Sequence, residues 1–410
     1  MPIGAGVRSC CCLPMGQMAV PKPVVPKKPR IAGWTSHRGA GPLRASGETE
    51  TLHRTERLTN LAKEFVHHWA EGAKEGPTDA VMGRLGQLMD DGMLVHAAGS
   101  PLGKGTVGVR DRLVHTHDMG GALQPKSVVL SAATEDDDSV FCLIECEEVP
   151  GAEGGIPSDE VHRAYGIVKF DVLFDDTALR VTEMFERYQL GPNDAPLLAV
   201  HAGAHKDMRA ALKEAGMSRF PSANIVKSGD FDREAAKLAI SAWCTARTTG
   251  FDETKLLAGC LDADKYRLWD GYGILPLVCG IDKAEGTTPA SCIQDYKGIV
   301  DMIFAAKAKY HIECKLVDSA VCTDCNVGFS HWRSHIRPFE RPGGNFVMEV
   351  DVPLPPPFLI QGREATIDAM EIHIFNKSGK ITDTWMLRDP MPEERQMMVE
   401  AKTKEEAASA

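Results

Sequence analysis

The sequence predicts an α+β protein made of two copies of one plan, each with three helices followed by a curved, mainly antiparallel sheet. Three observations support this fold class. Apolar residues recur at helical spacing near the start of each half, the apolar period then switches to two, and the chain closes on a long β-hairpin. With 410 residues, the chain is long enough for two domains and flanking segments.

The first copy shows the plan most clearly. Its first helix carries Leu58, Phe65 and Trp69 on one face, and a short strand that ends at His96 follows the second helix. Beyond the third helix, turn-rich segments separate stretches of alternating residues. The predicted elements are helices at 51–74, 78–89 and 107–116, and strands at 93–96, 126–132, 139–147, 161–173 and 179–188.

The second half of the chain repeats the first. Trp243 follows Trp69 by 174 residues in a matching segment, and the same offset pairs His96 with Asp270. The offset grows to 201 residues toward the C-terminus, because the loops of the second copy are longer. We therefore expect domains at 51–190 and 233–390, a linker with a short helix at 191–232, and a helical or disordered tail at 391–410.

The closing hairpin, at 362–390, contains the residues with the clearest chemical potential. Residues 367–375 alternate with both faces largely apolar, and Asn376-Lys-Ser-Gly379 forms the turn. Glu371 and His373 fall on one apolar face of this strand. A carboxylate there is costly unless it is paired, protonated or used in the function of the protein.

The first 50 residues are expected to be a disordered leader. Residues 1–47 contain basic side chains and prolines but no Asp or Glu, a composition that cannot build a core. Such a segment is typical of an organelle transit peptide, with cleavage between Arg44 and Thr51. We expect the mature protein in a plastid; the alternative is a cytoplasmic protein with a disordered tail.

Composition excludes two classes of partner. A net charge of −11 argues against a nucleic-acid surface, which needs a basic face. No apolar run approaches the roughly 18 residues that a membrane span requires. With 43% hydrophobic and 25% charged residues, the composition is that of an ordinary globular protein.

The cysteines are interpreted as reduced thiols. Cys322-Thr-Asp-Cys325 has a spacing that could hold zinc, but a structural zinc site normally has four ligands and no second C-x-x-C follows. We interpret this segment as a turn between strands, and we expect neither a metal site nor a cofactor. The four cysteines expected to be buried are Cys142, Cys146, Cys244 and Cys260.

The hairpin resembles a known family. An acid followed four residues later by Phe375, an Asn376-x-x-Gly379-Lys turn and then Trp385 are similar to the closing hairpin of SnoaL-like polyketide cyclases and ketosteroid isomerases. These belong to the nuclear transport factor two-like superfamily. The resemblance implies a cone of three helices wrapped by a curved sheet. It also implies cofactor-independent acid–base chemistry, of the lyase or isomerase class, on a small apolar carbonyl compound. The alternative is a non-catalytic binding or scaffold protein on the same fold.

The resemblance also implies site residues. The segment Trp269-Asp270-Gly271 matches the motif that holds the proton-accepting group, and Glu371 falls where the family has a protonated acid, with His373 beside it. We expect burial to keep Glu371 protonated; the alternative is that it pairs with Arg333 or His331 and holds the sheet together. The expected substrate-binding residues are Trp243, Tyr272, Trp269, His331, Trp332, Trp69 and His96.

Two further expectations concern the relation between the copies. Phe170 stands at the position of Glu371, so the first copy should bind without catalysing a reaction. Because single-cone relatives pair through the open face of the sheet, the two copies should form an internal pseudo-dimer, with further homo-oligomers as an open alternative.

Overall fold

The structure is a computed structural model of the whole chain. It describes residues 46–97, 103–118, 123–135, 137–148, 163–174, 178–188, 220–270, 293–338 and 365–388, which all belong to one compact unit, Ser46–Ala410. The first 45 residues of the expected leader, most of the linker and the tail at 391–410 lie outside the described residues. Residues 46–50, which were expected to be disordered, begin the first helix (Ser46–Glu75) instead. Among the described helices, none is both long and apolar enough to cross a membrane.

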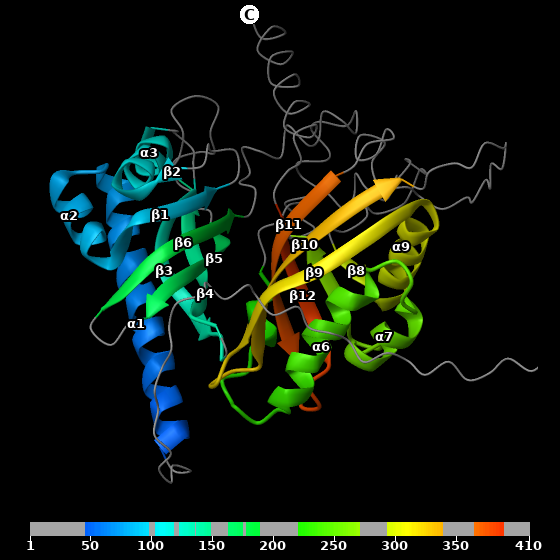
Figure 1. The fold of residues 1–410 in the computed structure, drawn as a ribbon. Helices are drawn as coiled ribbons and strands as arrows, with labels where there is room; N and C mark the ends of the chain where they lie inside the picture. The colour runs from blue at the N-terminus through cyan, green and yellow to red at the C-terminus, as the bar shows by residue number, and fades with distance from the viewer. Residues whose placement is uncertain are drawn as a thin grey trace, which may run out of the picture. The chain divides into compact units, whose positions relative to one another are not determined.

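In the described residues, the first copy has three helices and a six-stranded sheet (Figure 1). Its strands lie in the order β2-β1-β6-β5-β4-β3, and all neighbours are antiparallel except β1 and β6. The elements are α1 (Ser46–Glu75), α2 (Asp79–Leu88), β1 (Met89–Ala97), β2 (Gly103–Lys104), α3 (Gly105–Asp118), β3 (Leu123–Ala133), β4 (Ser139–Glu148), β5 (Arg163–Phe174) and β6 (Leu179–Tyr188).

The second copy repeats this topology. Its order, β8-β7-β12-β11-β10-β9, is the same pattern, and β7–β12 is its parallel pair. The predicted class, two α+β units with curved, mainly antiparallel sheets, is confirmed. The elements are η1 (Ser222–Asn224), α6 (Arg233–Ala246), α7 (Glu253–Cys260), β7 (Arg267–Asp270), β8 (Ile293–Asp295), α9 (Tyr296–Lys309), β9 (Tyr310–Val321), β10 (Val327–Pro338), β11 (Ala365–Phe375) and β12 (Ile381–Arg388).

Local sequence signals determine where several elements begin and turn. The side chains of Thr78, Asp232 and Asp295 each accept a hydrogen bond from the first turn of α2, α6 and α9, respectively. In the β11–β12 turn, the Asn376 side chain accepts from the backbone N–H of residues 378 and 380. Gly379 in this turn has a φ of 75°, which favours glycine.

Each sheet is covered on both faces. Helices cover one face of each sheet, and Trp69 and Trp243 are buried in the two resulting cores. A third cluster lies between the sheets, where the rings of Phe141 on β4 and Phe329 on β10 stack with centroids 5.6 Å apart. Described cysteines are free thiols; Cys142, Cys146, Cys244 and Cys260 are buried, as expected.

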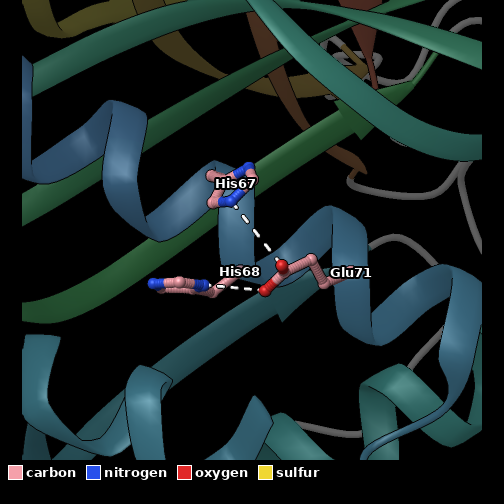
Figure 2. Close-up of side chains that lie close together, drawn as sticks. All are labelled: His67, His68 and Glu71. Carbon is pink, nitrogen blue, oxygen red and sulfur yellow. Dashed lines mark hydrogen bonds and ion pairs between the residues drawn. The ribbon is translucent and has the colours of Figure 1, made fainter.

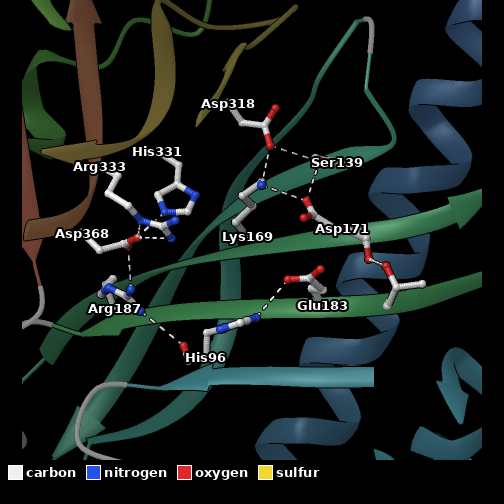
Figure 3. A network of polar contacts seen from close by, with 11 residues as sticks. His96, Ser139, Lys169, Asp171, Glu183, Arg187, Asp318, His331, Arg333 and Asp368 are labelled. Carbon is white, nitrogen blue, oxygen red and sulfur yellow. Dashed lines mark hydrogen bonds and ion pairs between the residues drawn. The ribbon is translucent and has the colours of Figure 1, made fainter. Parts of the chain in front are cut away.

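A network of polar contacts links strands of the two sheets (Figure 3). The ammonium group of Lys169, 1% exposed on β5, contacts Asp171 at 2.8 Å and also Asp318 on β9. Asp368 on β11 accepts from Arg187 of β6 at 2.7 Å and lies 2.9 Å from Nε2 of His331. Burial would raise the pKa of Asp368, but His331 and Arg187 together hold it well below its usual range.

We expect Gly379→Ala to destabilise the protein. The new Cβ would lie 2.6 Å from the Asp232 carbonyl oxygen and 2.8 Å from the Ala236 nitrogen, and the residue would keep a positive φ. The expected cost is about 1–3 kcal/mol, measured by urea unfolding. Gly83→Ala, in the middle of α2 with no atom within 4 Å of the new Cβ, is the matched control and should be neutral or stabilising. Equal losses in both variants would contradict the turn argument.

We expect Asp368→Asn to cost about 3 kcal/mol, because it leaves the buried Arg187 guanidinium without its carboxylate. Since folding lowers the pKa of Asp368, its contribution is complete above about pH 4 and is lost as the pH falls below that value. The difference in unfolding free energy between wild type and variant should therefore narrow in acid. Asp230→Asn, which removes an exposed ion pair with Lys377, should change little at either pH.

Candidate functional site

The candidate site lies on the face of the second sheet that the helices cover. Glu371 on β11 pairs with Ser330 on β10 and with Met386 on β12, and Met386 pairs with the backbone of Asp270 on β7. The two acids of the predicted site therefore occupy one row of the ladder. The side chain of Asp270 lies outside what the structure describes, so only its register is known.

The same row in the first copy is apolar. Phe170 pairs with Val140 and Met184, and Met184 pairs with Val95. Phe170 thus occupies the ladder position of Glu371, which is the correspondence that the repeat predicts. All four of these first-copy residues are buried.

The predicted correspondence between His96 and Asp270 is wrong by one residue. The ladder places Val95, not His96, at the position of Asp270. Neighbouring residues of a strand point to opposite faces, so His96 lies on the face away from the helices. There its ring stacks on Phe185, with centroids 4.2 Å apart, and its Nε2 lies 2.9 Å from a carboxylate oxygen of Glu183. The first copy has one residue fewer between Trp69 and Val95 than the second copy has between Trp243 and Asp270, which explains the shift.

Glu371 is fully buried and has several partners. Its carboxylate accepts hydrogen bonds from Nε1 of Trp243 at 2.8 Å, from Nη2 of Arg247 at 2.6 Å and from Oγ of Ser330 at 3.4 Å. Burial alone would raise the pKa of Glu371, but the charge of Arg247 and the hydrogen bonds from Arg247 and Trp243 act against it, and the pKa is lowered. The expectation of a protonated Glu371 is therefore wrong, because the cation beside it stabilises the carboxylate.

Pairing of Glu371 with Arg333 or His331 is also not what the structure shows. Both of these side chains bond to Asp368 on the opposite face. The cation comes instead from Arg247, the residue that ends α6, one turn after Trp243. Sequence reasoning missed Arg247, although its spacing of four residues from Trp243 places both on one helix face.

Arg247 is held between two tryptophan rings. Its guanidinium carbon lies 4.3 Å from the ring centroid of Trp243 and 4.3 Å from that of Trp332. One nitrogen, Nη2, bonds to Glu371, whereas Nη1 is buried and has no hydrogen-bond partner within the part of the chain that the structure describes. The same is true of the indole Nε1 of Trp332. Two neighbouring buried donors therefore have no acceptor.

His373 completes the site. Its Nε2 lies 2.9 Å from Ser330 Oγ and its Nδ1 lies 3.1 Å from Thr384 Oγ1. Burial lowers the pKa of His373 to about 4, so the ring is neutral at neutral pH. A neutral imidazole next to the Arg247–Glu371 ion pair leaves the described part of the site without net charge.

The other predicted residues that the structure describes do not join this site. Trp269 donates from Nε1 to Asp383 at 2.9 Å and packs against the cluster between the sheets, on the face opposite Glu371. His331 is buried in the same region, 5.1 Å from the Phe185 ring. Trp69 belongs to the first core, and Tyr272 lies outside the described residues.

Within the part of the chain that the structure describes, two groups of side chains could hold a metal ion. One is His67, His68 and Glu71 on α1 (Figure 2), with Nδ1 of His68 2.8 Å from Glu71. Arg84 already donates to the same Glu71 oxygen at 2.9 Å, and the His67 side chain is 68% exposed. The other group is Cys322, Asp324 and Cys325 in the β9–β10 turn.

No protein-family model matches this chain, and no curated protein matches it in sequence. Solved structures that it is similar to are small proteins that each match one part of it. The first, described as a candidate polyketide cyclase from Xanthomonas campestris, is 16% identical, with 32% of this chain and 90% of that chain covered and a TM-score of 0.25.

Two further solved structures show a similar level of likeness. An NTF2-like protein from Anabaena variabilis is 11% identical, with 37% of this chain and 97% of that chain covered and a TM-score of 0.23. A candidate polyketide cyclase from Streptomyces antibioticus is 13% identical, with 41% and 98% covered and a TM-score of 0.27. These likenesses concern the fold alone, and they are to the group of proteins that the closing hairpin resembles.

Proposed function

We propose that the second copy binds a small, largely apolar carbonyl compound and carries out cofactor-independent acid–base chemistry on it, such as cyclisation, isomerisation or dehydration. The observation that carries this proposal is the buried Arg247–Glu371 ion pair, which stands where the first copy has Phe170. Burying two charges is costly, and the same fold forms with an apolar residue at this ladder position. A charge that the fold does not need is the usual mark of a functional site.

The two donors without acceptors indicate what the site would bind. Nη1 of Arg247 and Nε1 of Trp332 are buried near each other and could donate to one oxygen atom of a ligand. Because Glu371 already balances the Arg247 charge, a carboxylate ligand would add an uncompensated negative charge, whereas a neutral ketone would not. During enolate formation the same two donors would stabilise the negative charge that develops on the carbonyl oxygen.

Roles for the acids follow from this arrangement. Asp270, in the row of Glu371, is proposed as the group that takes the proton next to the carbonyl. Glu371 is proposed to hold Arg247 in place between the two indole rings. His373 is neutral and bonded to Ser330, so it would orient that hydroxyl. Trp69, Tyr272 and His96 have no role in this proposal.

A non-catalytic binding protein is the second candidate. It is favoured by the hydrogen bonding of Glu371 and His373, whose polar atoms already have partners within the protein. Side chains satisfied in this way hold a binding site rigid but are poorly placed to exchange protons. The two candidates differ in whether a bound ketone loses a proton.

We expect Trp332→Phe to weaken the binding of a neutral aromatic ketone such as 1-tetralone about tenfold, measured by calorimetry. The variant keeps the ring that stacks on Arg247 and removes only the unpaired indole donor, and one hydrogen bond accounts for roughly that factor. Tetralin, which lacks the carbonyl, should bind wild type and variant equally. Trp269→Phe, on the opposite face, is the control and should leave both affinities unchanged. An equal loss for tetralin would refute an oxygen-binding role.

We expect the protein to accelerate exchange of the protons next to the carbonyl of 1-tetralone in deuterated water, followed by NMR. Asp270→Asn should reduce this rate by about 100-fold or more, because it removes the proposed proton acceptor. His96→Gln, in the first copy and on the other face of its sheet, should leave the rate unchanged. Binding without exchange in the wild type would favour the non-catalytic candidate.

A further inference from the structure

The turn between β9 and β10 brings together two thiols and a carboxylate that the proposed function does not use. We propose that this turn binds a thiophilic divalent metal ion such as Zn²⁺ through Cys322, Cys325 and Asp324. The proposal is independent of the function proposed for the helix-covered face, because these residues lie beyond the ends of the strands and the two cysteines belong to the cluster between the sheets.

The distances between the ligand atoms suit such an ion. The two Sγ atoms and a carboxylate oxygen of Asp324 all lie within 4.8 Å of one another. In a tetrahedral zinc site with normal bond lengths, ligand atoms are about 3.5–3.8 Å apart. The ligand atoms would therefore have to move together by about one ångström at most. Rotation of the side chains alone can supply a movement of that size.

The backbone of the turn is held in place from several sides. The Cys322 N–H donates to the Val327 carbonyl at 2.8 Å. The Asn326 side chain accepts from the Val226 N–H at 2.7 Å and donates to the Phe375 carbonyl at 2.8 Å. Since these bonds fix the loop before any metal arrives, little ordering of the chain would oppose binding.

The proposed site has one coordination position open to solvent. Cys322 and Cys325 are 2% and 1% exposed, whereas Asp324 is exposed, so the fourth position of the ion would face solvent and hold water. Soft thiolate ligands favour zinc over magnesium or calcium.

The binding step is balanced without an oxidant. Two S–H bonds break, two sulfur–metal bonds form, and both protons pass to the buffer. Because both thiols lose their protons when the metal ion binds, metal affinity should fall as the pH is lowered. The sequence analysis predicted no metal site because it counted only cysteines as ligands. Asp324 is the third ligand of the proposed site.

The test uses the full, reduced chain and Zn²⁺ in competition with a chromogenic chelator at neutral pH. We expect one ion per chain at this site, with Cys322→Ser and Cys325→Ser each weakening its binding by about 100-fold or more and Asp324→Asn by about tenfold. Asp324 is exposed, so its variant should fold normally even if a buried serine does not. Circular dichroism of each variant checks the fold.

Two controls separate this site from others. Cys142→Ser removes a buried thiol of the first core and should leave the affinity unchanged. His68→Ala breaks the α1 group and should also leave it unchanged. The proposal is overturned if zinc does not bind, if binding is lost in His68→Ala but kept in Cys322→Ser, or if Asp324→Asn binds as tightly as wild type. A Cys322–Cys325 disulfide that persists under reducing conditions would overturn it as well.

Discussion

Both faces of each sheet are buried, and this constraint shapes most of the structure. Helices cover one face and the other sheet covers the second face, so a central strand such as β11 is apolar on both sides. Every polar side chain on such a strand must then find a partner within the protein. Glu371 finds Arg247 on the helix side, and Asp368 finds Arg187 and His331 on the sheet side.

The two copies use this shared framework differently. The first copy fills the critical ladder row with apolar side chains, and Phe170 packs against Phe65 with ring centroids 5.2 Å apart. The second copy places an ion pair in the corresponding row and two tryptophans around it. The two copies thus differ in what this row contains, with Phe170 in the first copy at the ladder position of Glu371 in the second.

Much of the fold could be predicted because the signals are local. The alternation of 367–375, the Asn376–Gly379 turn and the helical spacing around Trp69 and Trp243 each indicate an element on their own. The repeat then gives the order of elements in the second copy. The site was harder, because it depends on contacts between residues far apart in sequence. Arg247 and Glu371 are separated by 124 residues, and no local pattern links them.

The error at His96 has the same origin. A strand reverses its faces at every residue, so one deleted residue between helix and strand exchanges a buried valine for a histidine on the opposite side. Trp269 and His331 were misplaced because alternation reveals that a strand has two faces but not which of them the helices cover. His331 and Arg333 lie on the same face of β10, where both bond to Asp368.

The last residues of the linker, 220–226, contact both copies. Phe220 packs against Tyr165 of the first sheet and Trp385 of the second, with centroids 5.4 Å and 5.1 Å away. A few residues on, Asn224 donates to Asp383 at 3.1 Å, and Val226 bonds to Asn326. Residues 220–226 therefore pack against the second copy, and Phe220 also contacts the first copy. A fragment of the second copy that starts at the first residue of α6 would lack residues 220–226 and their contacts. A fragment intended to fold should therefore start before residue 220.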